Sequence, residues 1–286
     1  METTPLRVMW FVPPLLVIVA ARDSGAPSVA GERNRSSDEQ FEALVSGRVD
    51  AVVTSMDNVI NWNSRPGPKD FRVVAQIERT TPLSLVARPG LSSVEELRGT
   101  NILVDAPDNG FVVALKAMLL EAGVVPGDYR LTPAGGVKER YDALIDGQGD
   151  ATLLGPPFDV MAAAAGQARI ATIQQKYPAF PGQGIVVRTG SARRAEVSSW
   201  LAALERARTE VLRAPDSALE AVKSAGLPPQ AAQAMVSLNP ATLRPAREGI
   251  ALLIAHRRAL ELLGSGESWN SIVDEAFMEL IEGASE

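Results

Sequence analysis

The sequence predicts an α/β protein of two lobes that close around a small ligand, with a helical C-terminal region. Short apolar segments alternate with helical patterns as far as Gly190, and only helical patterns follow it. A sequence pattern also recurs one hundred residues apart, which indicates two related lobes. With 286 residues, of which 46% are hydrophobic and 22% charged, the chain is long enough for more than one lobe.

The N-terminal apolar segment is predicted to form a strand, a turn and a helix. Residues 8–21 are nearly all apolar and resemble the centre of an export signal. However, Glu2 and Arg7 cancel the expected positive charge, and Pro13 and Pro14 interrupt the run. We therefore prefer a strand over 6–11, a proline turn and a helix over 15–23. On this interpretation the chain carries no export signal, and we expect no membrane insertion because the run is too short.

Six more segments are predicted as strands buried on both faces, because they are short and apolar. They are 51–55, 72–77, 83–87, 101–105, 151–155 and 185–188. Helical patterns lie between the strands at 37–47, 56–63, 93–97, 110–122, 137–146 and 158–165. This alternation predicts parallel sheets with right-handed crossovers.

The C-terminal region is predicted to be entirely helical. Its helical patterns cover 191–213, 218–225, 229–237, 247–263 and 268–282. Ser217 and Ser268 suit helix N-caps, and Gly226 and Gly264 suit helix ends.

The composition excludes several classes of site and partner. The chain has no cysteine and one histidine, which excludes thiol nucleophiles, disulfides, iron–sulfur clusters and His-rich metal sites. We expect no cofactor and no metal. His256 lies in a helical pattern and is expected on the helix surface or in the core. The net charge is −6 without a basic stripe, so we expect no nucleic-acid partner, and we expect a monomer.

The recurring pattern is aromatic-x-Ala-Leu-aliphatic-x-Gly-x-x-Asp-Ala. It covers residues 41–51 and 141–151 and describes a helix ended by glycine, a tight turn and a buried strand. The copies lead into two candidate ligand loops, 54–58 and 155–158. Because ligands bind beyond the carboxyl ends of parallel strands, two related lobes would direct both loops into one cleft. The alternative is that such turns recur in many unrelated α/β folds.

The order and spacing of several segments resemble a known family. The chain is similar to the solute-binding proteins of nitrate, sulfonate and taurine importers and to the related thiamine-pyrimidine-precursor group. The similarity covers residues 6–190 well and the C-terminal helices loosely. The segments that carry it are 6–8, 13–15, 36–44, 47–51, 54–58, 93–99 and 103–107.

The resemblance implies a type II periplasmic-binding-protein fold with a hinge. The first lobe would contain residues 1–86 and 186–286, and the second lobe residues 87–185. An ABC-transporter permease is the partner that the family implies, at a periplasmic or other extracytoplasmic location. A cytoplasmic location is the alternative if the export signal is truly absent. Residues 25–35 look shorter than the second strand usual in the family.

Candidate ligand contacts in the first lobe follow the predicted strands. Trp10 is expected either to stack on a flat ligand or to belong to the core. The hydroxyl and amide groups that follow the strands can hold polar atoms, although Asp57 is alternatively a helix cap and Ser37 with Gln40 forms a capping-box pattern. The complete set for this lobe is Trp10, Ser36, Ser37, Thr54, Ser55, Asp57 and Asn58.

Candidate contacts in the second lobe lie in the equivalent loops and near the return crossing. Asp108 or Asn109 is a natural N-cap for the next helix, and Phe158 is the expected aromatic wall of the cleft. The complete set for this lobe is Asp108, Asn109, Phe111, Gly155, Pro156, Phe158, Tyr177 and Phe180.

These residues predict binding of one small organic molecule. No Lys or Arg is expected at a strand end, which favours a flat or partly apolar ligand such as an aromatic carboxylate, a pyrimidine or a sulfonate. The alternative is an intracellular enzyme on the same fold, because some relatives of this fold catalyse lyase or decarboxylase-type reactions. Its acid–base groups would be Asp57, Asp105, Asp108 or Tyr177. A sensor would need an output domain, and none is visible in the sequence.

Overall fold

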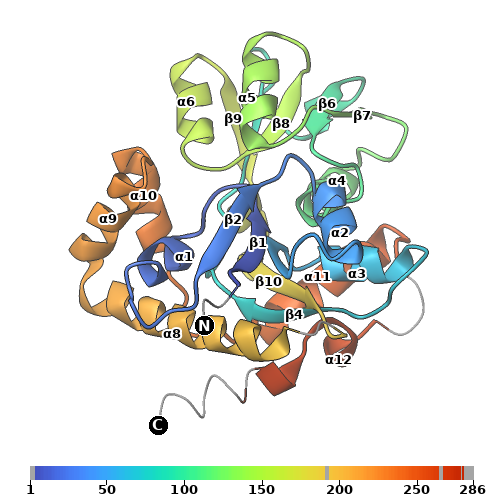
Figure 1. Ribbon diagram of the computed structural model, residues 1–286. Coiled ribbons are helices and arrows are strands. Elements are labelled where there is room, and N and C mark those ends of the chain that lie inside the picture. The colour runs from blue at the N-terminus through green and yellow to red at the C-terminus, as the bar shows by residue number, and fades with distance from the viewer. Residues whose placement is uncertain (1–3, 191–192, 264–266, 278, 280–286) are drawn as a thin grey trace.

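Two five-stranded sheets, one above the other in Figure 1, form the two lobes of the molecule. The computed structural model describes residues 4–190, 193–263, 267–277 and 279. The first sheet has the order β2 (Val29–Arg33), β1 (Leu6–Trp10), β3 (Ala51–Ser55), β10 (Gln183–Arg188) and β4 (Phe71–Gln76). The second has the order β7 (Arg130–Pro133), β6 (Asn101–Val104), β8 (Ala151–Leu154), β5 (Ser84–Ala87) and β9 (Ala168–Thr172).

The two sheets are mixed, so the prediction of parallel sheets holds for some strand pairs and not for others. β10 runs antiparallel to both β3 and β4, and β5 runs antiparallel to both β8 and β9. Both strands enter their sheet directly from the other lobe. A parallel neighbour would need a crossover connection within the same lobe, which these two strands lack.

Strand pairing places β5 wholly in the second sheet and β10 wholly in the first. The first crossing between the sheets therefore lies between Gln76 and Ser84, before residue 86, at which the first segment of the first lobe was expected to end. The division into residues 1–86 with 186–286, and 87–185, remains a proposal.

Three strands that the sequence pattern missed, β2, β7 and β9, all lie at sheet edges. Every residue of β2 and β7 is at least partly exposed. Their sequences, such as VAGER in β2, lack the apolar run of a strand buried on both faces. The stretch that looked short for a second strand thus contains a five-residue edge strand, β2.

Helices cover both faces of each sheet. In the first 190 residues they are α1 (Leu15–Ala20), α2 (Ser37–Val45), α3 (Asn58–Ser64), α4 (Gly110–Glu121), α5 (Val137–Ile145), α6 (Phe158–Ala164) and α7 (Ile173–Lys176), with a 3-10 turn, η1, at Glu95–Leu97. β1 and α1 confirm the prediction of a strand, turn and helix at the N-terminus.

The C-terminal region differs from the prediction in its helix bounds and in one N-cap. Its helices are α8 (Arg194–Arg213), α9 (Pro215–Ser224), α10 (Pro229–Ser237), α11 (Arg247–Ala259) and α12 (Trp269–Ile272). Ser217 lies inside α9, which starts at Pro215, so it is not an N-cap. Ser268 caps α12 as predicted, but α12 ends where Val273 pairs with Val73, and a separate helical stretch covers 275–277. Gly264 lies outside the described residues.

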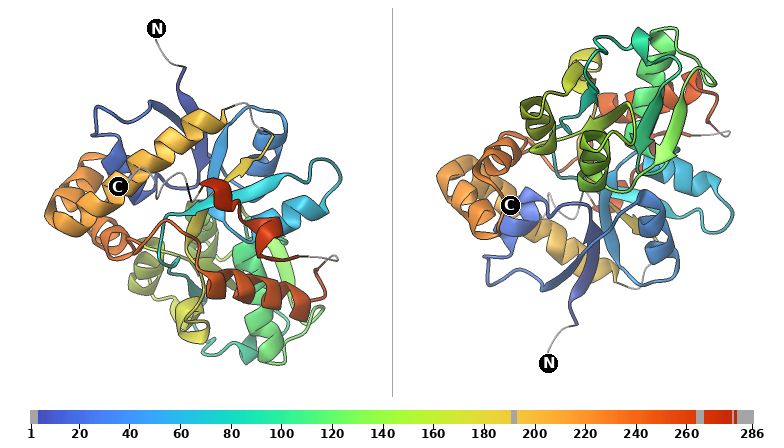
Figure 2. Two further views of the ribbon diagram at one scale, coloured as in Figure 1. Left: turned by 90° about the horizontal axis from the view of Figure 1, so that it is seen from below. Right: turned by 90° about the horizontal axis from the view of Figure 1, so that it is seen from above.

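Two apolar clusters fill the space around the first sheet. One joins Val8 and Trp10 of β1 to α1 and α8. The other joins Met9 on the opposite face of β1 to Leu85 and Leu115 of the second lobe and to Leu253 of α11. α11 packs against α4, and Figure 2 shows these two helices side by side. α11 therefore contacts both lobes.

The two copies of the repeat occupy equivalent places in the two sheets. Gly47 and Gly147 have φ values of 70° and 71°, the left-handed conformation that ends a helix with glycine. The carboxylate of Asp50 accepts the backbone N–H of Arg7 at 2.8 Å, and Asp150 accepts that of Asn101 at 2.7 Å. The matched spacing therefore reflects two lobes that share the same local structure.

Candidate functional site

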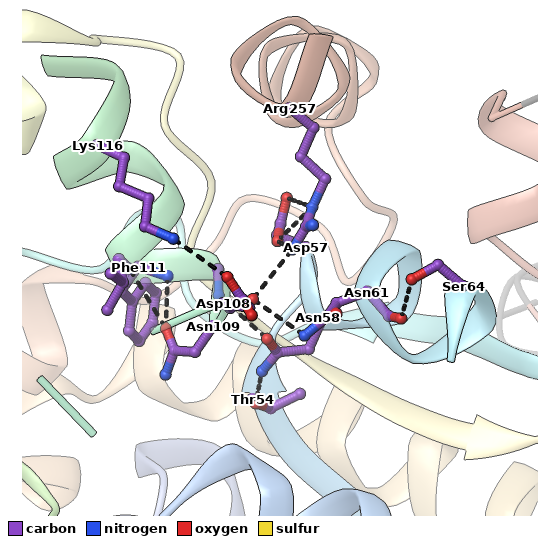
Figure 3. Close-up of polar contacts among 12 residues, drawn as sticks. Thr54, Asp57, Asn58, Asn61, Ser64, Asp108, Asn109, Phe111, Lys116 and Arg257 are labelled. Atoms are coloured by element: carbon purple, nitrogen blue, oxygen red, sulfur yellow. Dashed lines mark hydrogen bonds and ion pairs between the residues drawn. The ribbon is translucent and has the colours of Figure 1, made fainter. Parts of the chain in front are cut away.

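The loops that follow β3 and β6 meet between the lobes (Figure 3). Gly110 N–H donates to Asn58 Oδ1 at 3.1 Å, and Asn61 Nδ2 donates to the carbonyl oxygen of Asp108 at 3.0 Å. A Cβ atom on Gly110 would lie 2.2 Å from Ser55 Oγ, so only glycine permits this approach. We call the contact of residues 54–61 with residues 108–110 the interlobe junction.

A buried ion pair lies in the interlobe junction. Arg257 Nε is 2.9 Å from each carboxylate oxygen of Asp57, and both side chains are almost completely buried. Arg257 Nη2 also donates to the carbonyl oxygen of Asp108 at 3.2 Å (Figure 3). Asp57 makes no helix-cap hydrogen bond. The expectation that no cation reaches a strand end is therefore wrong: the cation comes from α11, two hundred residues along the chain.

The polar residues beside this pair are tied to one another. Asn58 Nδ2 donates to Thr54 Oγ1 at 2.8 Å, while Asn58 Oδ1 accepts from Gly110. Thr54, Ser55 and Asn58 are all buried. The predicted first-lobe residues Thr54, Ser55, Asp57 and Asn58 are thus brought together against the second lobe.

The second lobe contributes a buried carboxylate and a buried guanidinium. Asp105 follows β6 and accepts a hydrogen bond from Asn109 Nδ2, and Arg140 Nη1 lies 3.9 Å from Asp105 Oδ1. Burial raises the pKa of Asp105 and lowers the pKa of Arg140. Asn109 also accepts the N–H of Phe111 at 2.8 Å, which confirms it as the N-cap of α4.

Arg140 is the second-lobe counterpart of Gln40, and neither residue was expected to lie near the site. Gln40 Nε2 donates to the carbonyl of Val53 at 2.9 Å, and Arg140 Nη2 donates to that of Leu153 at 3.2 Å. Both side chains point inward from the equivalent helix toward the equivalent strand. Each of the two residues immediately precedes a copy of the repeat, at positions 40 and 140, and this equivalence in the sequence could have identified them as a pair.

A second contact between the lobes lies at the start of α5. Arg33 Nη2 is 3.5 Å from Glu139 Oε1, and a Cβ atom on Gly136 would lie 3.7 Å from the ring of Phe11. The ends of β1 and β2 thus face the start of α5. The lobes therefore contact one another here and at the interlobe junction.

The cap of α2 differs from prediction by one residue. Glu39 N–H donates to Ser36 Oγ at 3.2 Å, so Ser36 is the N-cap and the capping box expected from Ser37 and Gln40 is wrong. Gln40 turns inward instead. Ser37 Oγ is buried and, within the described part of the chain, has no hydrogen-bond partner.

The predicted aromatic residues do not gather at the interlobe junction. Trp10 lies over Gly31, where a Cβ atom would come within 2.1 Å of its ring, and it lines a hollow of about 750 Å³ shared with Trp200. Phe111 packs on Phe180 with ring centroids 6.2 Å apart. Trp10 thus packs in the first lobe, whereas Phe111 and Phe180 pack with the apolar cluster that joins the two lobes.

The loop that follows β8 carries its predicted aromatic into the second-lobe core. Gly155 precedes a cis peptide bond between Pro156 and Pro157. Phe158 then packs on Tyr141, with ring centroids 5.5 Å apart.

A group of titratable side chains lies beside the ion pair. Tyr177 Oη donates to Glu121 Oε1 at 2.9 Å, and its ring lies 4.4 Å from that of His256. Burial, and then the carboxylate of Glu121, raise the pKa of Tyr177 far above its usual value. Burial lowers the pKa of His256, although Asp57 and Glu121 oppose this shift. His256 is a buried core residue, one of its two predicted locations.

Each acid–base candidate is held by a partner of its own. Asp57 is paired with Arg257, Asp105 is bonded by Asn109, and Asp108 is exposed and 3.1 Å from Lys116 Nζ. Among the described residues there is no group of three or more His, Cys, Asp or Glu that could hold a metal ion. In that same part of the chain, no helix has the length and apolar character needed to cross a membrane.

Solved structures with the same fold match the chain almost end to end. The ligand-binding component of an ABC-type import system from Staphylococcus aureus has a TM-score of 0.80 at 10% identity, covering 99% of both chains. The alkanesulfonate-binding protein SsuA from Xanthomonas axonopodis pv. citri, bound to MOPS, has a TM-score of 0.74 at 16% identity, covering 99% of this chain and 98% of that one. The periplasmic nitrate-binding protein NrtA from Synechocystis PCC 6803 has a TM-score of 0.78 at 11% identity, covering 100% and 90%.

These similarities show the type II periplasmic-binding-protein fold that the sequence predicts. No curated protein matches the sequence. The NMT1/THI5-like family, in contrast, matches residues 30–218, which include four of the five strands of the first sheet and the whole second sheet. The chain therefore belongs to the NMT1/THI5-like family.

Proposed function

We propose that the protein binds one small organic molecule between its two lobes. The observation that carries this proposal is the interlobe junction, where buried hydroxyl, amide and carboxylate groups from both lobes meet. These groups bind one another in the structure, and a polar ligand that entered between the lobes would take the place of those mutual hydrogen bonds. Because the walls touch in the closed structure, the ligand would enter when the lobes part.

The chemistry of the walls favours a small acid with a flat or partly apolar body, an aromatic carboxylate or a sulfonate. The guanidinium of Arg140 has five N–H donors, and the structure assigns three of them to Thr152, Gly135 and Leu153. Two of the similar structures are named as an alkanesulfonate-binding and a nitrate-binding protein, and both of these ligands are anions. A pyrimidine is the alternative ligand, since hydroxyl and amide groups bind ring nitrogens and carbonyls.

We also propose that the protein delivers this ligand to an ABC-transporter permease outside the cytoplasm. The support is the fold, which it shares with the ligand-binding component of an import system and with periplasmic binding proteins. Enzymatic turnover on the same fold is kept as an outcome of the test.

The test is native mass spectrometry on protein purified without refolding, followed by thermal-shift screening of aromatic acids, sulfonates and pyrimidines. We expect an acid from the first two classes to raise the melting temperature and to be recovered unchanged. Ser55→Ala should weaken its binding about fivefold, because one hydrogen bond in a desolvated site contributes about 1 kcal/mol. Ser237→Ala, on the exposed surface of α10, is the matched control.

Three results would decide against parts of this proposal. Stabilisation by pyrimidines alone would replace the ligand class. Conversion of the stabilising compound during incubation would show an enzyme. Equal affinity of the parent and Ser55→Ala would place the ligand away from the interlobe junction.

A further inference from the structure

We propose that Arg257 is a positioning residue that holds the two lobes closed over the ligand. It does so by binding Asp57 of the first lobe and the backbone of Asp108 of the second lobe at the same time. We call the contacts of Arg257 with Asp57 and Asp108 the clasp. This proposal rests on the binding function proposed above, because holding the lobes closed matters only in a protein whose lobes open.

The C-terminal helix α11 is placed to act on both lobes. Ile250 and Leu253 belong to the apolar cluster that also contains residues of both sheets. α11 lies against α4 of the second lobe (Figure 2). From this position Arg257 extends into the interlobe junction, as Figure 3 shows.

The contacts of Arg257 cannot all survive opening. Asp57 belongs to the loop after β3, whereas Asp108 precedes α4, so the two partners lie on different lobes. If the lobes part, Arg257 must leave at least one of them. The planar guanidinium fork suits this double role, because it presents several donors in fixed directions.

Burial gives the clasp its strength. The side chains of Asp57 and Arg257 are 0% and 3% exposed. In such surroundings a charge that loses its partner is not compensated by water, so separation is strongly disfavoured. The neighbouring contacts of Asn58 with Gly110 and of Asn61 with Asp108 would break in the same movement.

The close approach at Gly110 offers an independent way to open the lobes. A Cβ atom there would lie 2.2 Å from Ser55 Oγ and 2.6 Å from Asp57 Cβ. Gly110 begins α4, where alanine is a better helix former than glycine. Gly110→Ala should therefore leave the second lobe folded while it separates the two loops.

The experiment measures the distance between the lobes without ligand. The chain has no cysteine, so Val45→Cys with Ile145→Cys gives two specific sites for spin labels. These exposed residues end α2 and α5 and are equivalent positions of the two copies. Pulsed electron spin resonance then reports the closed and open populations, with Gly110→Ala as the reference for the open form.

Removing the clasp should open the protein. We expect Arg257→Gln to lower the closed-to-open ratio roughly tenfold or more, the effect of losing a charged hydrogen bond. Arg257→Lys keeps the charge without the fork and should have an intermediate effect. Arg258→Gln makes the same charge change at the next, exposed residue of α11 and should leave the ratio unchanged.

Arg257→Gln leaves a buried carboxylate unpaired and can fail to fold, so the double variant Asp57→Asn with Arg257→Gln is measured as well. Parent-like distances in the folded Arg257→Lys and double variants would overturn the proposal. The thermal-shift screen tests the binding function separately. If the Arg257 variants open the lobes but no compound stabilises the protein, only the proposed binding function is refuted. If a compound stabilises the protein but the Arg257 variants keep the parent distances, only the proposed role of Arg257 is refuted.

Discussion

The two copies of the repeat fold alike, but the loops that follow them do not. In both copies a glycine near φ 70° ends the helix, and an aspartate accepts a backbone N–H at the start of the neighbouring strand. Beyond the copies the equivalence stops. Asp57 is ion-paired with a helix from the far end of the chain, whereas position 157 holds a proline that follows a cis peptide bond.

The buried helix residues differ in the same way. The first lobe uses the neutral amide of Gln40 where the second lobe uses the guanidinium of Arg140. The first lobe thus receives its cation from α11, and the second lobe carries its own beside Asp105. The repeated residues build the scaffold, and the residues that differ give each lobe its own buried charges.

The largest expected effect follows from the ion pair, which has no counterpart in the second copy. Asp57→Ala leaves Arg257 buried without its carboxylate and should lower the free energy of unfolding by about 3–5 kcal/mol. Urea denaturation measures this loss. Asp108→Ala removes an exposed carboxylate that is paired with Lys116 and should cost about 0.5 kcal/mol or less. Equal losses in the two variants would contradict the role of burial.

The aspartates that the copies share should differ in strength. Asp50 is nearly buried and binds the backbone and the side chain of Arg7, so Asp50→Ala should cost about 2–3 kcal/mol. Asp150 is more exposed and binds Asn101 N–H and Arg88, so Asp150→Ala should cost about 1 kcal/mol. Asp146→Ala, at an exposed position just before the same turn, is the control. Urea denaturation at neutral pH makes the comparison.

The pH dependence of the Asp50→Ala variant follows from the same contacts of Asp50. Burial acts to raise the pKa of Asp50, but the hydrogen bonds and charge of Arg7 outweigh it and lower that pKa. A lowered pKa contributes stability above the pKa of the unfolded state and loses it as the pH falls through the folded pKa. The difference between the parent and Asp50→Ala should therefore shrink in acid. If the difference in unfolding free energy grew as the pH fell, the pKa of Asp50 would be raised in the folded state and not lowered.

Much of the fold was predictable because its strands are buried on both faces. The seven predicted strands form the inner strands and the first-sheet edge β4, and they match within one or two residues. The exposed edge strands lack that signal. Period-two alternation also places Trp10 with Leu6 and Val8, on the face that packs against α1 and α8. Trp10 therefore belongs to the core of the first lobe, the second of its two expected locations.

The site was less predictable because its contacts join distant segments. The sequence indicated Thr54, Asp57 and Asn58 because they follow a buried strand. It gave no sign of Arg257, which differs from Arg258 only in the face of α11 that it occupies. The close approach at Gly110 was equally invisible, since glycine at the start of a helix has many causes.

The smallest effect tests the feature that the copies share most exactly. Gly47 and Gly147 have positive φ, and no atom lies within 4 Å of a Cβ atom added to either. Alanine at either position should therefore cost about 1 kcal/mol through backbone strain alone, and equally in both copies. Gly47→Asn and Gly147→Asn should cost less, because asparagine tolerates the left-handed conformation. Urea denaturation measures the loss of unfolding free energy in each alanine variant. Unequal losses would show that the two turns are not equivalent, and the equivalence of the two copies would then be limited to their strands.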